Sequence, residues 1–426
     1  MTEERVTVIG GGFAGSEAAM TLSKLNVKVL LIEKRPDEKM KHFNNSASFA
    51  YPVCSNSFKS VEIKNAHGLL KAELAVMRSD IMYHAHKTRV KAGKALAIDR
   101  DEFSSSVTSE IESDANIAVK RKEADRSDIS KMTIIAAGPF ASQNILDYIK
   151  EKAGRDFYHF TDAVSPIVSR DSVNMNICFT ASRYNEGSDY VNCPMTKDEF
   201  NKFYDELLNA ERAEFDETDR EEFFSGCMPF EEIARYGRRA LVFGVMKPVG
   251  FDKKYYAVVQ LRNENREGTM LNLVGCQTRL KWREQDRIVR MIPGLEKTEI
   301  LRYGVMHRNP YVDSPTVLNE NLEFKNQSGS FLAGQLTGSE GYMEAVLTGL
   351  YAALSVYSKL NKKSISLPPE TTMSGSLLRY ILKSNKKISP MNANFGLFKE
   401  YSKKDKLFYA KRALRDIYGW YNETTH

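Results

Sequence analysis

The stretch that decides the fold lies near the start of the chain and reads Val6-Thr7-Val8-Ile9-Gly10-Gly11-Gly12-Phe13-Ala14-Gly15-Ser16-Glu17-Ala18-Ala19. Its apolar, β-branched opening predicts a buried parallel strand, and the alanines at its end predict a helix. Gly10, Gly12 and Gly15 have the spacing G-x-G-x-x-G. The first glycine permits a tight turn, the second lets backbone approach a pyrophosphate, and the third lets helix and strand pack closely. We therefore expect phosphates to bind at the N-terminus of this helix.

A second apolar run supports a nucleotide site. Residues 27–32 predict another buried strand, which ends at Glu33, 18 residues beyond Gly15. An acidic side chain at this place accepts hydrogen bonds from an adenosine ribose. The alternative is a glycine-rich strand–helix turn that binds nothing, and the strand, the spacing and the acid together disfavour it.

Two later stretches, 132–139 and 331–338, predict further buried strands that end in glycine turns. The candidate cofactor contacts in these turns are Gly138, Gly334, Gln335 and Gly338. An Ala-Gly-Gln turn that opens a helix far from the N-terminal loop is typical of flavoproteins, in which the helix points at the flavin ring or the second phosphate. This layout favours FAD over NAD.

The middle of the chain has a different pattern. Strand-like and charged helical stretches alternate there without a glycine phosphate loop, which indicates an inserted domain. We expect an α/β protein with a Rossmann-like FAD-binding domain of the glutathione-reductase type, an inserted α+β domain and a basic C-terminal helical segment. The expected parts are 1–168 and 301–365 for the FAD-binding domain, 169–300 for the insertion and 366–426 for the C-terminal segment. A single helix is expected over about 68–87.

Composition indicates a globular protein. The chain has 426 residues, of which 42% are hydrophobic and 27% charged. It has no run of 18 apolar residues, so we expect no contact with a membrane. A strand that begins at Val6 leaves no room for a leader, and a cytoplasmic protein is expected.

Positive charge is concentrated at the C-terminus. The net charge is +6, whereas the part from Lys359 onward has 14 Lys/Arg and 5 Asp/Glu, a local net of +9. With its many aromatic residues, this segment suits a polyanion such as RNA. A solvated helical tail explains the same composition equally well.

The five cysteines are Cys54, Cys178, Cys193, Cys227 and Cys276. Their odd number and the lack of C-x-x-C spacing argue against a disulfide framework and a zinc site, and we expect no bound metal. The apolar surroundings of Cys178 and Cys276 predict core packing, which we also favour for Cys193. Cys54 lies in a long polar loop and Cys227 in a Ser-Gly-Cys-Met-Pro turn, so these two are the candidates for chemistry.

The sequence resembles the folate- and FAD-dependent RNA (uracil-5-)-methyltransferases over nearly its whole length. The segments that carry the resemblance are 10–18, 53–57, 65–71, 190–195, 226–229, 243–250, 280–282, 291–294, 303–309, 333–338 and 390–396. The resemblance implies that methylenetetrahydrofolate supplies a carbon to uracil C5, that reduced FAD supplies a hydride, and that NADPH or NADH reduces the flavin.

The resemblance also assigns roles to two cysteines. Cys227 matches the cysteine regarded as the nucleophile, whose thiolate adds to uracil C6 and makes C5 reactive. Cys54 matches a second cysteine near the flavin, which removes the C5 proton or shields the flavin. Lys281, Trp282 and the segment 307–309 either contact the folate or pack between domains.

The RNA partner is left open by this resemblance. The T-loop uridine of tRNA is favoured, and a uridine of 23S ribosomal RNA is the first alternative. Two further alternatives are a general FAD oxidoreductase acting on a small molecule and a non-catalytic RNA-binding subunit that keeps FAD as a structural element. The sequence leaves open whether the protein is a monomer or a homodimer.

Overall fold

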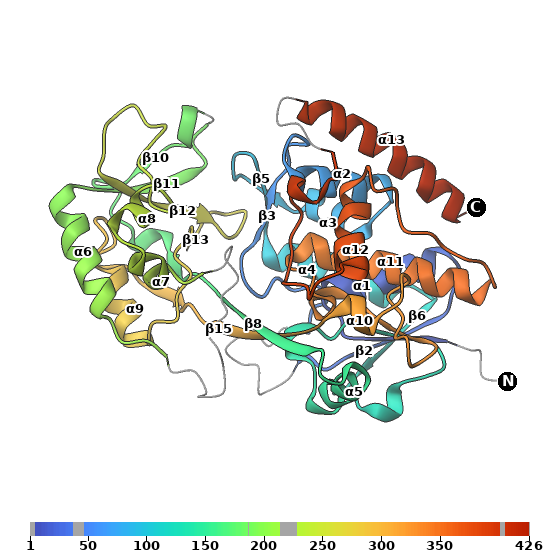
Figure 1. The fold of residues 1–426 in the computed structure, drawn as a ribbon. Coiled ribbons are helices and arrows are strands. Elements are labelled where there is room, and N and C mark those ends of the chain that lie inside the picture. Colours follow the sequence, from blue (N-terminus) through green and yellow to red (C-terminus); the bar gives the residue numbers. More distant parts are fainter. Residues whose placement is uncertain (1–4, 37–46, 186, 214–227, 401–404, 426) are drawn as a thin grey trace.

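The computed structural model describes residues 5–36, 47–185, 187–213, 228–400 and 405–425. Two lobes lie side by side, and a long two-stranded ribbon runs between them (Figure 1). The ribbon consists of β8 (Phe157–Ala163) and β15 (Met306–Val312), which pair antiparallel. None of the described helices is both long and apolar enough to cross a bilayer.

The larger lobe is built on a five-stranded parallel sheet. Its order is β16 (Ser330–Leu332), β7 (Thr133–Ile135), β1 (Val6–Ile9), β2 (Val29–Glu33) and β6 (Ile117–Arg121). All four residues of β1 are buried, as expected of a parallel strand covered on both faces. β2 and β6 lie on one side of β1, whereas the later strands β7 and β16 lie on its other side. The strand order thus reverses at β1, and a crevice for a ligand opens beyond its C-terminal end.

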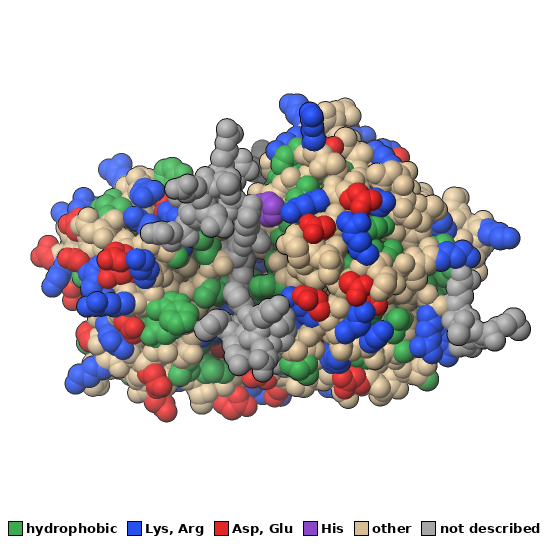
Figure 2. All heavy atoms as spheres, turned by 90° about the horizontal axis from the view of Figure 1, so that it is seen from below, with side chains coloured by type: hydrophobic (Ala, Val, Ile, Leu, Met, Phe, Trp, Pro, Cys, Tyr) green, Lys and Arg blue, Asp and Glu red, His purple; other side chains and the backbone are tan. Residues whose placement is uncertain are grey.

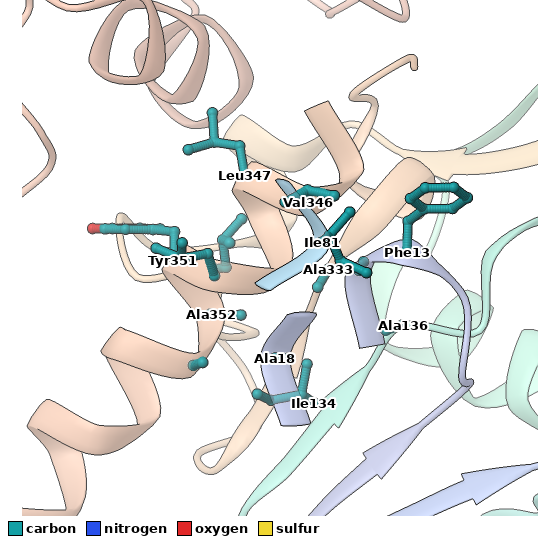
Figure 3. Close-up of a cluster of buried hydrophobic side chains, with 14 of the residues drawn as sticks. Phe13, Ala18, Ile81, Ile134, Ala136, Ala333, Val346, Leu347, Tyr351 and Ala352 are labelled. Carbon is teal, nitrogen blue, oxygen red and sulfur yellow. The ribbon is translucent and has the colours of Figure 1, made fainter. Parts of the chain in front are cut away.

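Two helices from opposite ends of the chain pack together on this sheet. These are α1 (Phe13–Lys24) and α11 (Tyr342–Leu360). Figure 3 shows Phe13 and Ala18 of α1, Ile134 of β7, and Val346 and Tyr351 of α11 in one buried cluster. The late helix therefore belongs to the N-terminal nucleotide fold, and the expected Rossmann-like α/β class is confirmed.

Other elements of the larger lobe lie between β2 and α11 in the sequence. Among them are β3 (Ser57–Ser60), β4 (Arg89–Val90), β5 (Ala95–Ile98), α4 (Arg100–Ser113), α5 (Gln143–Ala153) and α10 (Ser314–Val317). β3, β5 and β4 form a small antiparallel sheet.

The smaller lobe is a six-stranded sheet with helices on it. Its order is β10 (Phe179–Thr180), β11 (Tyr190–Met195), β12 (Ala257–Asn263), β13 (Met270–Leu273), β9 (Ile167–Ser169) and β14 (Ile300–Arg302). The helices are α6 (Lys197–Asn209), α7 (Phe230–Arg235), α8 (Arg238–Val242) and α9 (Trp282–Val289). All its strand pairs are antiparallel, in contrast to the main sheet. The domain limits at 168 and 300 stay a prediction.

The helix predicted for residues 68–87 is wrong. The expected helix over 68–87 is two helices, α2 (Ala66–Val76) and α3 (Asp80–Lys87). Arg78 between them has a φ of 59°, which a continuous helix cannot contain. Ser79 then caps α3 by accepting the Met82 N–H, and its hydroxyl donates to Glu17 on α1 at 2.7 Å.

The C-terminal segment contains α12 (Met373–Lys383) and α13 (Lys406–Thr425). The inner side of α13 buries Ala410, Ala413, Ile417 and Trp420. Trp420 packs near Tyr351, and its Nε1 donates to the Ser366 carbonyl at 3.0 Å. α13 is therefore docked on the larger lobe, as Figure 1 shows at its upper edge.

Candidate functional site: a cavity between the lobes

A cavity of about 390 Å³ lies where the main sheet, the ribbon and the smaller lobe meet. The larger lobe contributes the glycine turn after β1, the end of β2 and the start of α11. The ribbon contributes Phe160 and Asn309, and the smaller lobe contributes Arg262 and Asn272. The cavity thus opens at the sheet's switch point, where α/β folds bind ligands.

The three glycines of the N-terminal turn have different surroundings. Gly10 has a φ of 100°, and a Cβ there would lie 2.6 Å from the Ala136 carbonyl oxygen. A Cβ on Gly15 would lie 1.8 Å from the Gly10 oxygen, so Gly15 lets α1 approach the strand. Gly12 lines the cavity, and a Cβ on it would have nothing within 4 Å. Its backbone is therefore open to a ligand at the N-terminus of α1.

Glu33 lines the cavity at the end of β2, and its carboxylate is already engaged. It accepts the Gly11 N–H at 2.6 Å, and from Arg35 it accepts both the backbone N–H at 2.9 Å and Nε at 3.0 Å. Burial opposes its charge, but Arg35 and these hydrogen bonds hold the pKa of Glu33 below its usual value. Glu33 is therefore a carboxylate anion beside the glycine turn, and it can accept a further hydrogen bond from a hydroxyl group.

The later glycine turns divide into two groups. Gly138, Gly334 and Gln335 line the cavity, as Gly10 and Gly12 do. Gly338 does not line it: its N–H donates to the Gln335 carbonyl at 2.9 Å and closes the turn. Gly15 also lies outside the lining, behind Gly10.

Two buried side-chain amide nitrogens at the cavity have no hydrogen-bond partner among the described residues. Gln335 Nε2 and Asn309 Nδ2 have no hydrogen-bond partner within the described part of the chain, and both residues line the cavity. Buried amide donors normally find a partner, which a ligand with polar ring edges or hydroxyls would supply. The residues present therefore fit a dinucleotide that extends from Gly12 to Gln335.

Cys54 lies in the cavity wall, half-buried. Its N–H donates to the hydroxyl oxygen of Tyr342 at 2.8 Å, and its Sγ lies 2.8 Å from the same oxygen. The structure thus brings Cys54 to the glycine turns and to the start of α11. Cys227, the other candidate for chemistry, lies outside the described residues.

The three other cysteines are buried, as predicted. Cys178, Cys193 and Cys276 are at most 5% exposed. Cys178, the residue before β10, and Cys193 of β11 have their sulfurs 3.4 Å apart.

Lys71, which the sequence analysis did not single out, also lines the cavity. Burial lowers the pKa of Lys71 to about 8, and its ammonium donates to the carbonyls of Phe58 at 2.6 Å and His67 at 2.8 Å. Near it, His67 Nδ1 lies 3.5 Å from a Glu344 carboxylate oxygen. A lysine on the apolar face of α2 was the available signal, since lysines are seldom fully buried.

Of the candidate folate contacts, some lie at the cavity and others lie away from it. Asn309 lines the cavity, whereas Trp282 is half-exposed outside it and stacks on Tyr303 at 5.3 Å. Lys281 pairs with Glu211 at 2.9 Å on the outside of the smaller lobe. The side chains of residues 307 and 308 lie outside the described structure.

Comparisons with known proteins match most of the chain or nearly all of it. The family described as "Glucose inhibited division protein A" matches residues 5–364. A methylenetetrahydrofolate–tRNA-(uracil-5-)-methyltransferase, TrmFO, of Fervidobacterium nodosum is 47% identical over 99% of this chain and 98% of its own. The protein of the same name from Staphylococcus saprophyticus is 46% identical over 97% of each chain.

A solved structure supports the fold. GidA of Aquifex aeolicus superposes with a TM-score of 0.75 at 17% identity, covering 100% of this chain and 74% of that chain. At this identity the likeness concerns the fold alone.

Proposed function

Since the chain belongs to the glucose inhibited division protein A family, and within it to the TrmFO group, we propose that it methylates uridine C5 in tRNA. The carbon donor would be 5,10-methylenetetrahydrofolate and the redox cofactor FAD. The observation that carries the proposal is an identity of 46–47% along nearly the whole chain to proteins named for this reaction. Cys54 in the wall of a cavity suited to a dinucleotide agrees with it.

The residues that would hold FAD come from both ends of the chain. The backbone around Gly10 and Gly12 would receive the pyrophosphate at the N-terminus of α1, and Glu33 would accept a ribose hydroxyl. The amides of Gln335 and Asn309 would donate to the part of the ligand that lies across the cavity. When bound, FAD supplies hydride chemistry that no side chain provides.

Uracil C5 is a weak nucleophile until a group adds to C6. In the proposed reaction the Cys227 thiolate forms a bond to C6, and the electrons of the C5–C6 double bond move to C5 and the C4 oxygen. These electrons form the bond from C5 to the one-carbon unit that methylenetetrahydrofolate donates. The proton on C5 must then leave, and Cys54 is the group we assign to accept it or to shield the flavin. Elimination of the Cys227 thiolate restores the ring double bond.

Several finer features belong to this proposal. We assign the T-loop uridine as the target, a reduced nicotinamide as the reductant and the cytoplasm as the compartment. The basic C-terminal segment would contact the RNA backbone. The tRNA assignment follows the names of the relatives, and ribosomal RNA and a small-molecule substrate have no comparable support.

The test is transfer of label from methylenetetrahydrofolate, labelled at the methylene carbon, to RNA. FAD-loaded enzyme, a reduced nicotinamide and either unmodified tRNA or 23S rRNA are incubated, and the labelled nucleotide is mapped. We expect 5-methyluridine in tRNA only. Label in ribosomal RNA alone would reject the tRNA assignment, and label in neither RNA would reject the proposed reaction.

Variants test the two cysteines. Cys227→Ala should abolish transfer while the flavin stays bound, and Cys54→Ala should reduce it at least ~100-fold, the scale of one acid–base group. Cys276→Ala is the matched control, because this thiol is 2% exposed and packs in the smaller lobe. Full activity of Cys227→Ala would show that Cys227 is not the nucleophile.

A further inference from the structure

Cys54 and Tyr342 form a close pair, although 288 positions separate them in sequence. The phenol oxygen lies 2.8 Å from the Cys54 nitrogen and 2.8 Å from its sulfur. Tyr342 is the first residue of α11, and its ring is fixed by stacking on Phe13 at 4.5 Å and by an edge contact with Phe58 at 5.5 Å. The hydroxyl therefore has a fixed position relative to Cys54.

Either atom could donate in the contact between the phenol oxygen and the Cys54 sulfur. The phenol oxygen accepts the Cys54 N–H. When the sulfur is a thiolate it has no proton to give, and the phenol is then the donor. Among the described residues, the Cys54 sulfur is the acceptor that lies within reach of the phenol proton. Burial, and next the proximity of Cys54, raise the pKa of Tyr342 well above its usual range. The phenol thus keeps its proton, which is available to an acceptor such as the Cys54 sulfur.

Three arginines hold the loop that carries Cys54. The Cys54 carbonyl accepts hydrogen bonds from Arg100 and from Arg302, the latter at 3.2 Å. Arg262 donates to the Ser55 hydroxyl at 2.8 Å and to the Asn56 amide oxygen at 3.1 Å. Arg100 also pairs with Glu264, with 2.6 Å between nitrogen and oxygen.

The charge of this scaffold favours an anion beside it. Arg100, Arg262 and Arg302 are largely buried, and the carboxylate of Glu264 pairs with the first of them. Cationic groups and hydrogen-bond donors stabilise a thiolate relative to a thiol.

We propose that Tyr342 is a positioning residue that donates a hydrogen bond to the Cys54 sulfur and holds it as a thiolate in the cavity. The role rests on the proposed function, in which Cys54 accepts the proton from uracil C5. A thiolate held by one donor is ready to take that proton, and the phenol keeps its own proton throughout. The sulfur gains the proton that C5 loses, so the step needs no other reactant.

The test measures the reactivity of Cys54 itself and needs no RNA. FAD-loaded protein is treated with iodoacetamide from about pH 6 to about pH 10, a range that brackets ordinary thiol ionisation. The rate of alkylation of the Cys54 peptide is followed by mass spectrometry. In Tyr342→Phe, which keeps the ring and removes the hydroxyl, the pH of half-maximal rate should rise by about one unit.

Tyr351→Phe is the matched control. Tyr351 lies on the same helix, and its hydroxyl donates to the Glu320 carbonyl at 3.0 Å, away from the cavity. This variant should keep the wild-type profile. In Tyr342→Phe the plateau rate at high pH should equal that of the wild type, which shows that the site is intact.

The outcomes separate this inference from the proposed function. An unchanged profile in Tyr342→Phe overturns the inference, even if RNA methylation is found. A shifted profile supports it, even if no RNA accepts the methyl group. With active enzyme, Tyr342→Phe should lower kcat near pH 7 with KM for tRNA unchanged, and raising the pH should restore kcat. Equal loss of kcat at all pH values would indicate a merely structural role.

Discussion

Gly12 and Gly15 are three residues apart in the N-terminal glycine motif, but their surroundings differ. Gly12 faces the cavity, where a Cβ would meet only open space, whereas a Cβ on Gly15 would meet the Gly10 oxygen at 1.8 Å. A side chain on Gly12 would therefore occupy space that a ligand needs. A side chain on Gly15 would clash with the protein backbone. Substitutions should separate binding from folding.

Gly12→Val is expected to weaken FAD binding by about a hundredfold, or about 2.8 kcal/mol, because the side chain fills the space next to the helix N-terminus. The fold should persist. Flavin absorbance after gel filtration measures the binding, and the Tm of the variant should match that of flavin-stripped wild type.

Gly15→Ala is the counterpart and should lower the stability of the flavin-free protein by about 1–3 kcal/mol, the usual cost of overpacking. Urea unfolding of both variants measures the difference. If Gly12→Val is as unstable as Gly15→Ala, the open space at Gly12 is not a binding site for the pyrophosphate.

At the scale of elements, Glu73 connects two helices. It lies on α2 and accepts the N–H groups of Met373 and Ser374, both at 2.7 Å, at the start of α12. The Ser374 hydroxyl donates to it as well, at 2.6 Å. A carboxylate at a helix N-terminus satisfies amides that have no partner within the helix.

The stability that Glu73 provides should depend on pH. Burial raises the pKa of Glu73 from 4.5 to about 7, so the folded protein binds this proton more tightly than the unfolded chain. Its contribution is then greatest below pH 4.5 and declines as the pH rises through about 7, by up to about 3 kcal/mol.

Glu73→Gln provides the reference, since glutamine has nearly the same shape and does not titrate. The free energy of unfolding of wild type minus that of Glu73→Gln should fall between about pH 4.5 and about pH 7 and stay constant above. Urea titrations at a series of pH values give this difference. A difference that rises over this range would mean that the N–H donors outweigh burial.

At the scale of the whole molecule, the distribution of charge bears on the RNA partner. On the face shown in Figure 2, acidic and basic side chains are interspersed over both lobes. The excess of positive charge belongs to the C-terminal segment, where Lys411 and Arg415 are exposed on α13. Phe408 and Tyr418, both more than 60% exposed, flank them. We therefore expect this helix to contact a phosphate backbone.

Lys411→Ala and Arg415→Ala should each weaken tRNA binding and reduce the slope of log K against log salt by about one. Filter binding over a range of salt concentrations measures both effects. Lys197→Ala, an exposed lysine on α6 of the other lobe, is the control. Unchanged slopes for both C-terminal variants would support a solvated tail instead.

The sequence by itself determined the parts of the fold that depend on neighbouring residues. The strand before Gly10, the acid at the end of β2 and the late turn at Gly334 are local patterns, because backbone sterics and strand burial act over a few residues. The family also followed from the sequence, because its motifs extend along nearly the whole chain.

The tertiary structure alone decided what meets at the site. No local pattern joins Cys54 to Tyr342, or directs Arg262 of the smaller lobe to Ser55, because these contacts form only when both lobes have folded. The break between α2 and α3 has the same cause: Ser79 caps α3 and donates to Glu17 on α1. Propensity over a dozen residues favours one helix there, and contacts between distant segments outweigh it.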